Sequence, residues 1–246
     1  MKLIDMHSHI LPEADHGSDS VETSIEQLKR ARKAGVSVIL ATPHFYYHSD
    51  NIDDFLIRRE KSYRKLKKAM SENGLDDIRI FLGAEVRLEV DLLKETRLSK
   101  LCIEGTNKLL LEMPFDMKWT EWIYNYVFEI AVKYKIKPII AHIDRYEDKP
   151  AKRLIDMGLE AQINASSLCR FSSRMKMMKY VKSGAVKYLG SDVHGPKSPE
   201  YNEFEKGVRV LGKYADDIMY NSARVLGLAD RAEENGEKNI GGGLIF

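Results

Sequence analysis

Short apolar runs alternate with amphipathic segments along most of the chain. Runs typical of buried strands lie at 2–6, 36–41, 78–85, 108–113, 137–143, 159–164 and 186–191. Segments with apolar residues at helical spacing separate them, at 21–34, 53–71, 119–134, 151–157 and 167–182, and two more follow at 201–214 and 221–228. Strands that alternate with helices from end to end predict a parallel α/β fold.

The number of runs bears on the architecture. We count about seven strands, which indicates a barrel slightly short of the usual eight. No low-complexity linker divides the 246 residues, so we expect residues 1–246 to form a single domain. The tail from Ala229 to Phe246 is charged and then glycine-rich, and we expect it to be loosely held.

Composition narrows the classes of function. A formal net charge of +2 gives no bulk electrostatic case for binding nucleic acid or a membrane surface. Two cysteines, Cys102 and Cys169, do not make a disulfide framework in a chain of this length. Residues 1–9 lack the apolar core of a secretory signal, and no apolar run approaches the roughly 18 residues of a membrane span. We therefore expect a cytoplasmic protein.

Histidines and acidic residues stand where predicted strands end. The set comprises His7, His9, His44, Glu85, Glu112, His142, Asp192 and His194. The carboxyl ends of parallel strands open on one face of the fold, so these distant residues are expected to converge there. The sequence therefore predicts a metal-dependent hydrolase whose site binds two or three divalent cations.

Two short motifs have the spacing of paired metal ligands. His7 and His9 are two residues apart, as are Asp192 and His194, so each pair points to one side of a strand. Histidine combined with carboxylate suits zinc, manganese or iron. The alternative for the histidine pair alone is two unrelated polar residues, and the other strand-end ligands weigh against it.

Glu85 and Glu112 each follow an apolar run. A glutamate in that position is usually exposed at a strand end. Among histidine ligands, it is better interpreted as a carboxylate that bridges two metals about 3.5–4 Å apart.

Three further features stay open at this level. Arg145 lies in the loop after His142 and can bind phosphate oxygens in bidentate fashion, or form an ordinary surface salt bridge. Asp15 and His16, in the loop after the first strand, are alternative ligands. The aromatic run 45–47 can stack on a substrate ring or simply pack its loop.

These motifs in this order resemble the PHP (polymerase and histidinol phosphatase) superfamily. They are most similar to its bacterial protein-tyrosine-phosphatase branch, the CpsB/CapC/YwqE type encoded with capsule and exopolysaccharide genes. The matching stretches run from Ile4 to Gly195 and read IDMHSHILPEADHG, ATPH, GAEV, LLLEMP, IIAHIDRYE and LGSDVHG. The resemblance implies a distorted (β/α)7 barrel with a three-metal site at the carboxyl ends of the strands.

The resemblance also implies roles for individual residues. The first metal would be held by His7, His9, Glu85 and Asp192, and Glu85 would bridge to a second metal held by Glu112 and His142. His44, His194 and the residue before Gly17 would hold the third, and Arg145 matches an arginine that binds phosphate. The metal is expected to be manganese, with iron or zinc as alternatives.

The chain departs from the family pattern at two positions. His16 stands before Gly17, where the family usually has an acid, and Asp15 is the alternative ligand. The loop after His194 offers Lys197 where the branch often has an arginine. Lysine still pairs with phosphate, although as a point charge without the planar fork of arginine.

The activity that the resemblance implies is hydrolysis of phosphotyrosine on a bacterial tyrosine autokinase. That would regulate capsule or exopolysaccharide synthesis at the inner face of the membrane without insertion. A cysteine-based phosphatase is unsupported, because Lys108 and Met175 stand six positions after the two cysteines, where an arginine is needed.

Other functions remain as alternatives. A phosphoesterase for a small monoester, such as histidinol phosphate or a sugar phosphate, would share the metals and have a deeper pocket. A metal-dependent amidohydrolase would commonly use a modified lysine where this chain has Glu85 and Glu112. A non-catalytic metal-bound regulator is a third alternative. A DNA exonuclease would be expected to carry a stripe of basic residues, which this sequence lacks.

Overall fold

Parallel strands form the centre of the molecule. The computed structural model describes residues 2–195 and 200–229, and all statements below concern these residues. Their strands form two sheets, in the orders β1-β2-β4 and β3-β5-β6-β7-β8-β9, and every neighbouring pair is parallel. The strands are β1 Leu3–Ser8, β2 Val36–Ala41, β3 His44–Phe45, β4 Arg79–Leu82, β5 Glu85–Arg87, β6 Lys108–Glu112, β7 Lys137–Ile140, β8 Glu160–Asn164 and β9 Val186–Gly190.

Two strands of the first sheet continue into the second. Only residues 42–43 separate β2 from β3, and only residues 83–84 separate β4 from β5. Gly83 N–H donates to Ala41 O at 2.9 Å, and Glu85 N–H donates to Pro43 O at 3.1 Å, so pairing carries on across both interruptions. Counting each interrupted strand once, the described chain has the seven strand positions that the sequence predicts.

The segment after β9 meets the first strand. Asp192 N–H donates to His7 O at 2.8 Å, and His9 N–H donates to Val193 O at 3.2 Å. These hydrogen bonds connect the far edge of the second sheet to β1, so the strands follow one another around a distorted barrel. The predicted parallel α/β fold is confirmed.

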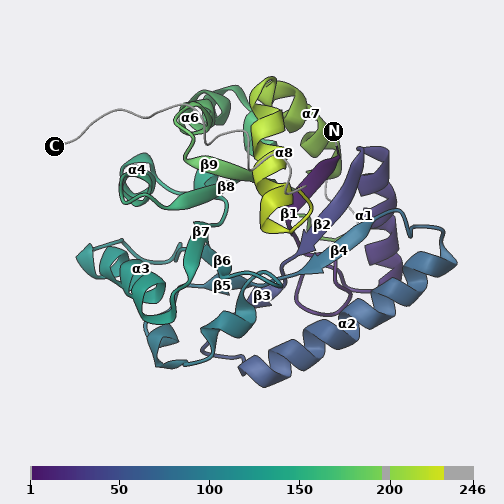
Figure 1. Cartoon of the computed structure of the whole chain (residues 1–246), viewed down its shortest axis with the longest axis horizontal. Helices are drawn as coiled ribbons and strands as arrows, with labels where there is room; N and C mark the ends of the chain where they lie inside the picture. Colours follow the sequence, from purple (N-terminus) through teal and green to yellow (C-terminus); the bar gives the residue numbers. More distant parts are fainter. Residues whose placement is uncertain (1, 196–199, 230–246) are drawn as a thin grey trace, which may run out of the picture.

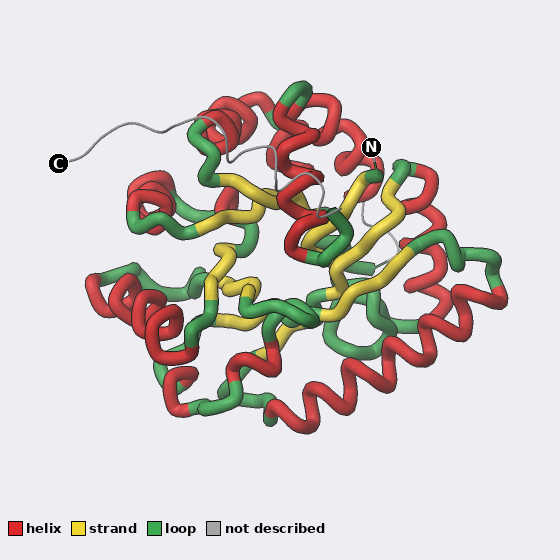
Figure 2. Tube along the Cα trace, viewed as in Figure 1, coloured by secondary structure: helices red, strands yellow, loops and turns green. Residues whose placement is uncertain are grey.

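Helices surround the strands (Figures 1 and 2). Ser20 caps the first long helix by accepting from Thr23 N–H at 3.1 Å, and Asn51 caps the second by accepting from Asp53 N–H at 2.8 Å. The helices are α1 Val21–Lys33, α2 Ile52–Glu72, α3 Glu121–Tyr134, α4 Asp148–Asp156, α5 Ala165–Cys169, α6 Phe171–Lys182, α7 Glu200–Leu211 and α8 Tyr214–Val225, with 3-10 turns η1 Leu92–Lys94, η2 Leu98–Leu101 and η3 Ile143–Arg145.

Some predicted boundaries are wrong. The segment 167–182 is two helices, because Arg170 has an extended backbone with φ −100° and ψ 131°. The predicted strand 137–143 stops at Ile140, and its last residue belongs to η3. Gly212, with φ 55°, ends α7, so α8 begins at Tyr214 and not at 221 as expected.

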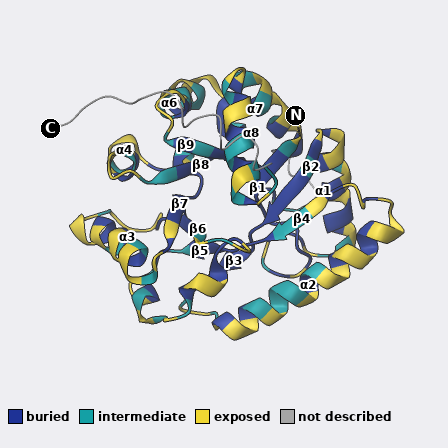
Figure 3. Ribbon diagram, in the orientation of Figure 1, coloured by how far each residue is buried: buried dark blue, intermediate teal, exposed yellow. Residues whose placement is uncertain are grey.

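The interior of the barrel and the inner helix faces are buried, while the outer helix faces are exposed (Figure 3). The buried hydrophobic side chains form one cluster that extends from Ile4 to Leu226. None of the described helices is long and apolar enough to cross a bilayer. The predicted tail from Ala229 lies outside the described residues, apart from Ala229 itself.

Candidate metal centre

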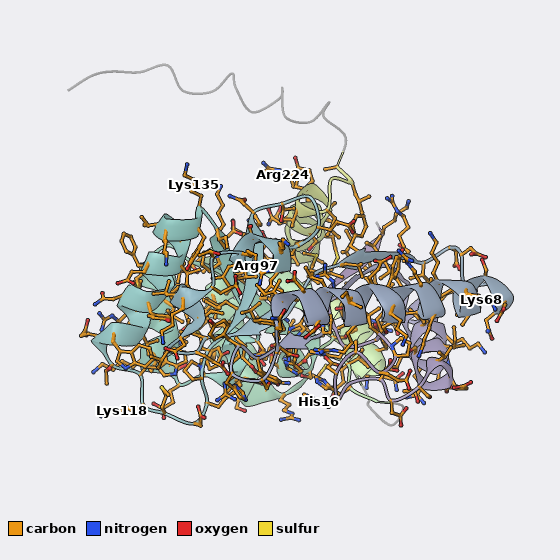
Figure 4. The ribbon with its side chains drawn as sticks, turned by 90° about the horizontal axis from the view of Figure 1, so that it is seen from below. His16, Lys68, Arg97, Lys118, Lys135 and Arg224 are labelled. Carbon is orange, nitrogen blue, oxygen red and sulfur yellow. The ribbon has the colours of Figure 1, made fainter. Side chains whose placement is uncertain are left out.

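The strand ends bring the predicted ligands together at one end of the barrel. His7 lies in β1, His44 begins β3, Glu85 begins β5 and Glu112 ends β6. The remaining four follow directly after β1, β7 and β9: His9, His142, Asp192 and His194. Figure 4 shows His16 along the same edge of the molecule as Lys118, while Lys135, which precedes β7, lies at the opposite edge.

Glu85 lies at the centre of the cluster and is fully buried. Its Oε2 lies 3.3 Å from His7 Nε2 and 3.0 Å from His44 Nδ1. Its Oε1 lies 2.7 Å from His142 Nε2, which is itself 3.5 Å from Glu112 Oε1. One carboxylate therefore faces donor atoms from three other strands, as a bridging ligand must.

The ring nitrogens of His7 and His9 face each other in a way that suits a cation. Gln162 Oε1, which can only accept, lies 3.1 Å from His7 Nδ1, and Asp15 Oδ2 lies 2.7 Å from His9 Nδ1. Each Nδ1 is therefore a hydrogen-bond donor, and the two Nε2 atoms face each other 3.1 Å apart. Asp192 Oδ1 lies within 3.5 Å of both. The two Nε2 atoms and this carboxylate oxygen are placed as the ligands of one divalent cation would be.

Unpartnered polar atoms give a second indication of metal binding. Among the described residues, the buried His142 Nδ1 makes no hydrogen bond, and neither do His44 Nδ1 and Glu85 Oε2, although these two atoms lie 3.0 Å apart. Buried polar groups are normally paired, so an exception needs an explanation such as a bound ion. Donor atoms that lie within 4.8 Å of one another form three sets: His9, His44 and His194; His7, His9 and Glu85; and His44, Glu85 and Glu112. The donors therefore fit divalent cations.

Asp15 and His16 occupy different positions relative to these sets. Asp15 Oδ2 accepts from His44 N–H at 2.9 Å in addition to its contact with His9, and Oδ1 accepts from Gly17 N–H at 2.9 Å. Both of its oxygens are therefore engaged in holding other groups. The ring of His16 lies 4.6 Å from that of His44 and 5.0 Å from that of His194. This geometry favours His16 as the additional ligand.

Two of the predicted ligands have unusual backbones. His142 has φ 29° and Asp192 has φ 57°, values that non-glycine residues rarely adopt. Strain of this kind persists where the surroundings dictate the conformation, and it gathers at functional sites. Here it turns each side chain toward the centre directly after its strand ends.

Burial and nearby charges shift the pKa values of the cluster. Burial lowers the pKa of His194 to about 4, so its ring is neutral at pH 7. Against the effect of burial, contacts with Glu112 and Glu85 raise the pKa of His142 to about 9. Burial opposes ionisation of Asp192, but the neighbouring histidines hold its pKa well below its usual range. Such perturbed groups mark functional sites.

Gln162 and Asn164 support the ligands, and the sequence analysis missed both. Gln162 Oε1 accepts from His142 N–H at 2.6 Å, and its Nε2 donates to Asn164 Oδ1 at 2.9 Å. Asn164 Nδ2 donates in turn to Asp192 Oδ2 at 2.8 Å. Both side chains are buried. Polar residues two apart at the end of an apolar strand were the available signal.

Arg145 lies at the edge of the cluster. Its Nη2 donates to Asp192 Oδ2, and its side chain remains 44% exposed, so the guanidinium is open to a ligand from solvent. The other predicted phosphate-binding residue, Lys197, lies outside the described residues.

Of the two expectations for the aromatic run 45–47, stacking on a substrate ring is wrong for Phe45. Phe45 is fully buried and packs against Phe55, so it belongs to the core. Tyr46 is half-buried, with its ring 5.2 Å from that of His44. Phe115, which the sequence analysis did not single out, is 52% exposed, and its ring lies 5.6 Å from that of His142.

The fold and the site together define a class of protein, a parallel α/β barrel with a buried histidine–carboxylate centre suited to divalent cations. Within this class the chain belongs to the CpsB/CapC family of capsular polysaccharide synthesis, whose model matches residues 3–226. The resemblance noted in the sequence is thereby confirmed.

Individual relatives agree with this assignment. Tyrosine-protein phosphatase YwqE of Bacillus subtilis is 28% identical over 234 residues, which cover 89% of this chain and 87% of YwqE. Tyrosine-protein phosphatase CpsB of Streptococcus agalactiae is 25% identical over 206 residues, covering 78% and 83% respectively. A chain from the crystal structures of Bacillus subtilis YwqE and Streptococcus pneumoniae CpsB, described as unique metal-dependent tyrosine phosphatases, shares the fold. It aligns with a TM-score of 0.76 at 20% identity and covers 93% of this chain and 96% of that chain.

Proposed function

We propose that this protein is a metal-dependent protein-tyrosine phosphatase that acts on a bacterial tyrosine autokinase and so regulates capsule or exopolysaccharide synthesis. The observation that carries the proposal is the buried convergence of histidines and carboxylates around Glu85, in a chain whose family relatives are named tyrosine-protein phosphatases. The protein would work in the cytoplasm.

The donor sets support two or three ions. We assign one ion to His7, His9, Glu85 and Asp192, a second to Glu85, Glu112 and His142, and a third to His44, His194 and His16. Manganese suits these nitrogen and oxygen ligands, as do iron and zinc. Bound there, the ions would lower the pKa of water toward neutrality and neutralise charge on a phosphoryl group.

The residues of the chain would position and stabilise the substrate. Arg145, half-exposed at the edge of the centre, would bind two phosphate oxygens through its planar fork. Its present partner, Asp192, holds it within reach of the ligands. Lys197 is proposed as a second cation for the phosphate. Asp15 would act by orienting His9, because both of its oxygens are already engaged.

A thiol mechanism has no support among the described residues. Burial raises the pKa of the Cys102 thiol to about 12, and burial also raises the pKa of Cys169. Neither sulfur is therefore a thiolate at neutral pH, which is the form that attacks phosphorus.

The direct test is phosphate release from a phosphotyrosine peptide by metal-reconstituted protein, with a chelated sample and histidinol phosphate in parallel. We expect metal-dependent release from the peptide that is much faster than release from histidinol phosphate. Faster turnover of histidinol phosphate would contradict the proposal and move the function to small-molecule metabolism. Deletion of the gene should raise phosphorylation of the kinase, and an unchanged level would count against that partner.

A further inference from the structure

A groove of about 1490 Å³ opens beside the candidate metal centre. It is lined by the loop after β6, by η3 and α4, and by the second half of α6. Three of its lining residues also contact the centre: Arg145 pairs with Asp192, and the rings of Phe115 and Tyr146 lie 5.6 Å and 5.7 Å from that of His142. A substrate held at Arg145 would therefore extend directly into this space, which we call the basic groove.

The charge of the basic groove is strongly uneven. Seven cationic and three acidic side chains line it, in a chain whose formal net charge is only +2. The cationic ones are Lys118, Arg145, Lys149, Lys152, Arg153, Lys176 and Lys179.

Some of these cations are already paired. Lys152 is 2.6 Å from Asp156, and Lys176 is 2.6 Å from Asp148. Lys118, Lys149 and Lys179 are exposed and make no ion pair with any residue in 2–195 or 200–229. Three lysines beside the centre are therefore available to an anionic partner.

The end of the basic groove nearest the centre has an aromatic wall. The ring of Tyr146 lies 5.2 Å from that of Phe115 and 5.0 Å from that of Trp119. Trp119 Nε1–H donates to Pro114 O at 2.8 Å, and Met113 N–H donates to the Tyr146 hydroxyl at 2.9 Å. These hydrogen bonds hold Trp119 and Tyr146 in place, and the exposed ring of Phe115, stacked on Tyr146, presents an apolar face to the groove.

We infer that the basic groove binds acidic residues that flank the phosphotyrosine of a peptide substrate, and thereby sets substrate preference. The inference rests on the proposed function, because it places the phosphate at Arg145. The charge of the groove is complementary to aspartate and glutamate side chains, and its connection to the centre suits a chain that continues past the reacting residue. A small phosphate monoester would leave the three lysines unused.

The experiment compares two phosphotyrosine peptides of equal length, one flanked by aspartate and glutamate and the other by serine and glycine. The protein is metal-loaded, and kcat and KM are measured for each. We expect kcat/KM to favour the acidic peptide by about tenfold, the size that three exposed ion pairs provide. The difference should lie mainly in KM and should shrink as salt is added.

Charge-reversal variants test whether the three lysines of the basic groove cause the preference for the acidic peptide. The variant Lys118→Glu, Lys149→Glu, Lys179→Glu should lose the preference, with hydrolysis of p-nitrophenyl phosphate unchanged. The matched control is Lys29→Glu, Lys33→Glu, Lys67→Glu, which changes the same net charge on exposed lysines of α1 and α2, across the molecule from α4 (Figure 1). The control should keep the preference, and thermal midpoints of both variants verify folding.

The outcomes separate this inference from the proposed function. If neither peptide is hydrolysed, the proposed function fails, and the inference fails with it. If both peptides are hydrolysed equally well, the function stands and the inference is overturned. Loss of preference in both triple variants would also overturn it, because the effect would then reflect net charge. Binding of phosphatidylserine vesicles through the three groove lysines, with peptide kinetics unaffected by the reversal, would assign the groove to a lipid surface instead.

Discussion

Glu85 is the residue on which the most contacts of the candidate centre depend. Its carboxylate lies within 3.3 Å of four histidines, His7, His9, His44 and His142, and has no solvent exposure. The substitution Glu85→Gln keeps the size of the side chain but removes the charge that neutralises a cation. We expect loss of at least one bound metal per chain and a fall in kcat of about a hundredfold or more, the scale of losing a charge-stabilising group at an active site. Elemental analysis and phosphate release measure the two effects.

The control for this substitution is Glu89→Gln. Glu89 pairs with the exposed His48, whose Nδ1 lies 2.6 Å from Oε1 and whose backbone N–H donates to Oε2 at 2.8 Å. It should keep full metal content and activity. Retention of both by the Glu85 variant would show that the centre does not hold metal in the way proposed.

Gln162 tests whether the ligands need their supporting contacts. Its Oε1 accepts from His142 N–H and fixes the proton of His7 on Nδ1. Gln162→Met fills a similar volume without these hydrogen bonds. We expect metal affinity to fall by about 10–100-fold, as for other residues that orient metal ligands. Titration of the chelated protein with manganese measures this, and unchanged affinity would reduce Gln162 to a packing role.

The candidate metal ligands could be predicted from the sequence, whereas the residues that hold them in place could not. His7 and Glu85 follow or end apolar runs, and the rule that parallel strands share one open edge predicts where they go. Gln162 looks like any polar residue in a strand until its partners are known. Likewise Phe45 and Phe115 differ in burial for reasons of tertiary packing that local pattern does not contain.

At the scale of elements, Asp5 joins the first strand to the last. Its carboxylate, fully buried in β1, accepts from Ser191 N–H at 2.8 Å, from Ser191 Oγ at 2.6 Å and from the Tyr201 hydroxyl at 3.0 Å. Asp5→Ala would remove the buried acceptor of all three hydrogen bonds. We expect a loss of about 2–4 kcal/mol in the free energy of unfolding.

Urea unfolding of the chelated protein measures this loss without a contribution from metal. Tyr201→Phe removes one of the donors and should cost about 1 kcal/mol. Glu129→Ala, at an exposed position of α3, is the control and should change stability by less than about 0.5 kcal/mol. An Asp5 variant as stable as this control would mean that the junction contributes nothing.

The sequence predicted which segments are strands and which are helices better than it predicted where each one begins and ends. Alternating apolar runs and amphipathic segments identified the parallel strands, because a buried strand and a surface helix have different periods. The interruptions at 42–43 and 83–84 were not foreseen, since they arise where strands pass from one sheet to the other. The break at Arg170 was missed because helical spacing continues on both sides of it.

At the scale of the whole molecule, the centre links strands from both ends of the chain. A cation that binds only the folded state stabilises it, by about 2.7 kcal/mol when the free ion is a hundredfold above its Kd. For a chain of this length that corresponds to a rise in Tm of roughly 5–10 °C. Differential scanning calorimetry with EDTA and then with excess manganese tests this. The Glu85→Gln variant should show a smaller rise, and equal rises would place the stabilising ion elsewhere.

The two hydrogen bonds that join residues 7–9 to residues 192–193 have a consequence for how the protein is made. Residues 7–9 are synthesised long before their partners at residues 192–193. Until residues 192–194 emerge, His7 and His9 lack the acid that completes their set, so a partly synthesised chain has no finished centre. Truncated products of translation should therefore be inactive, and loading with metal should follow release of the chain.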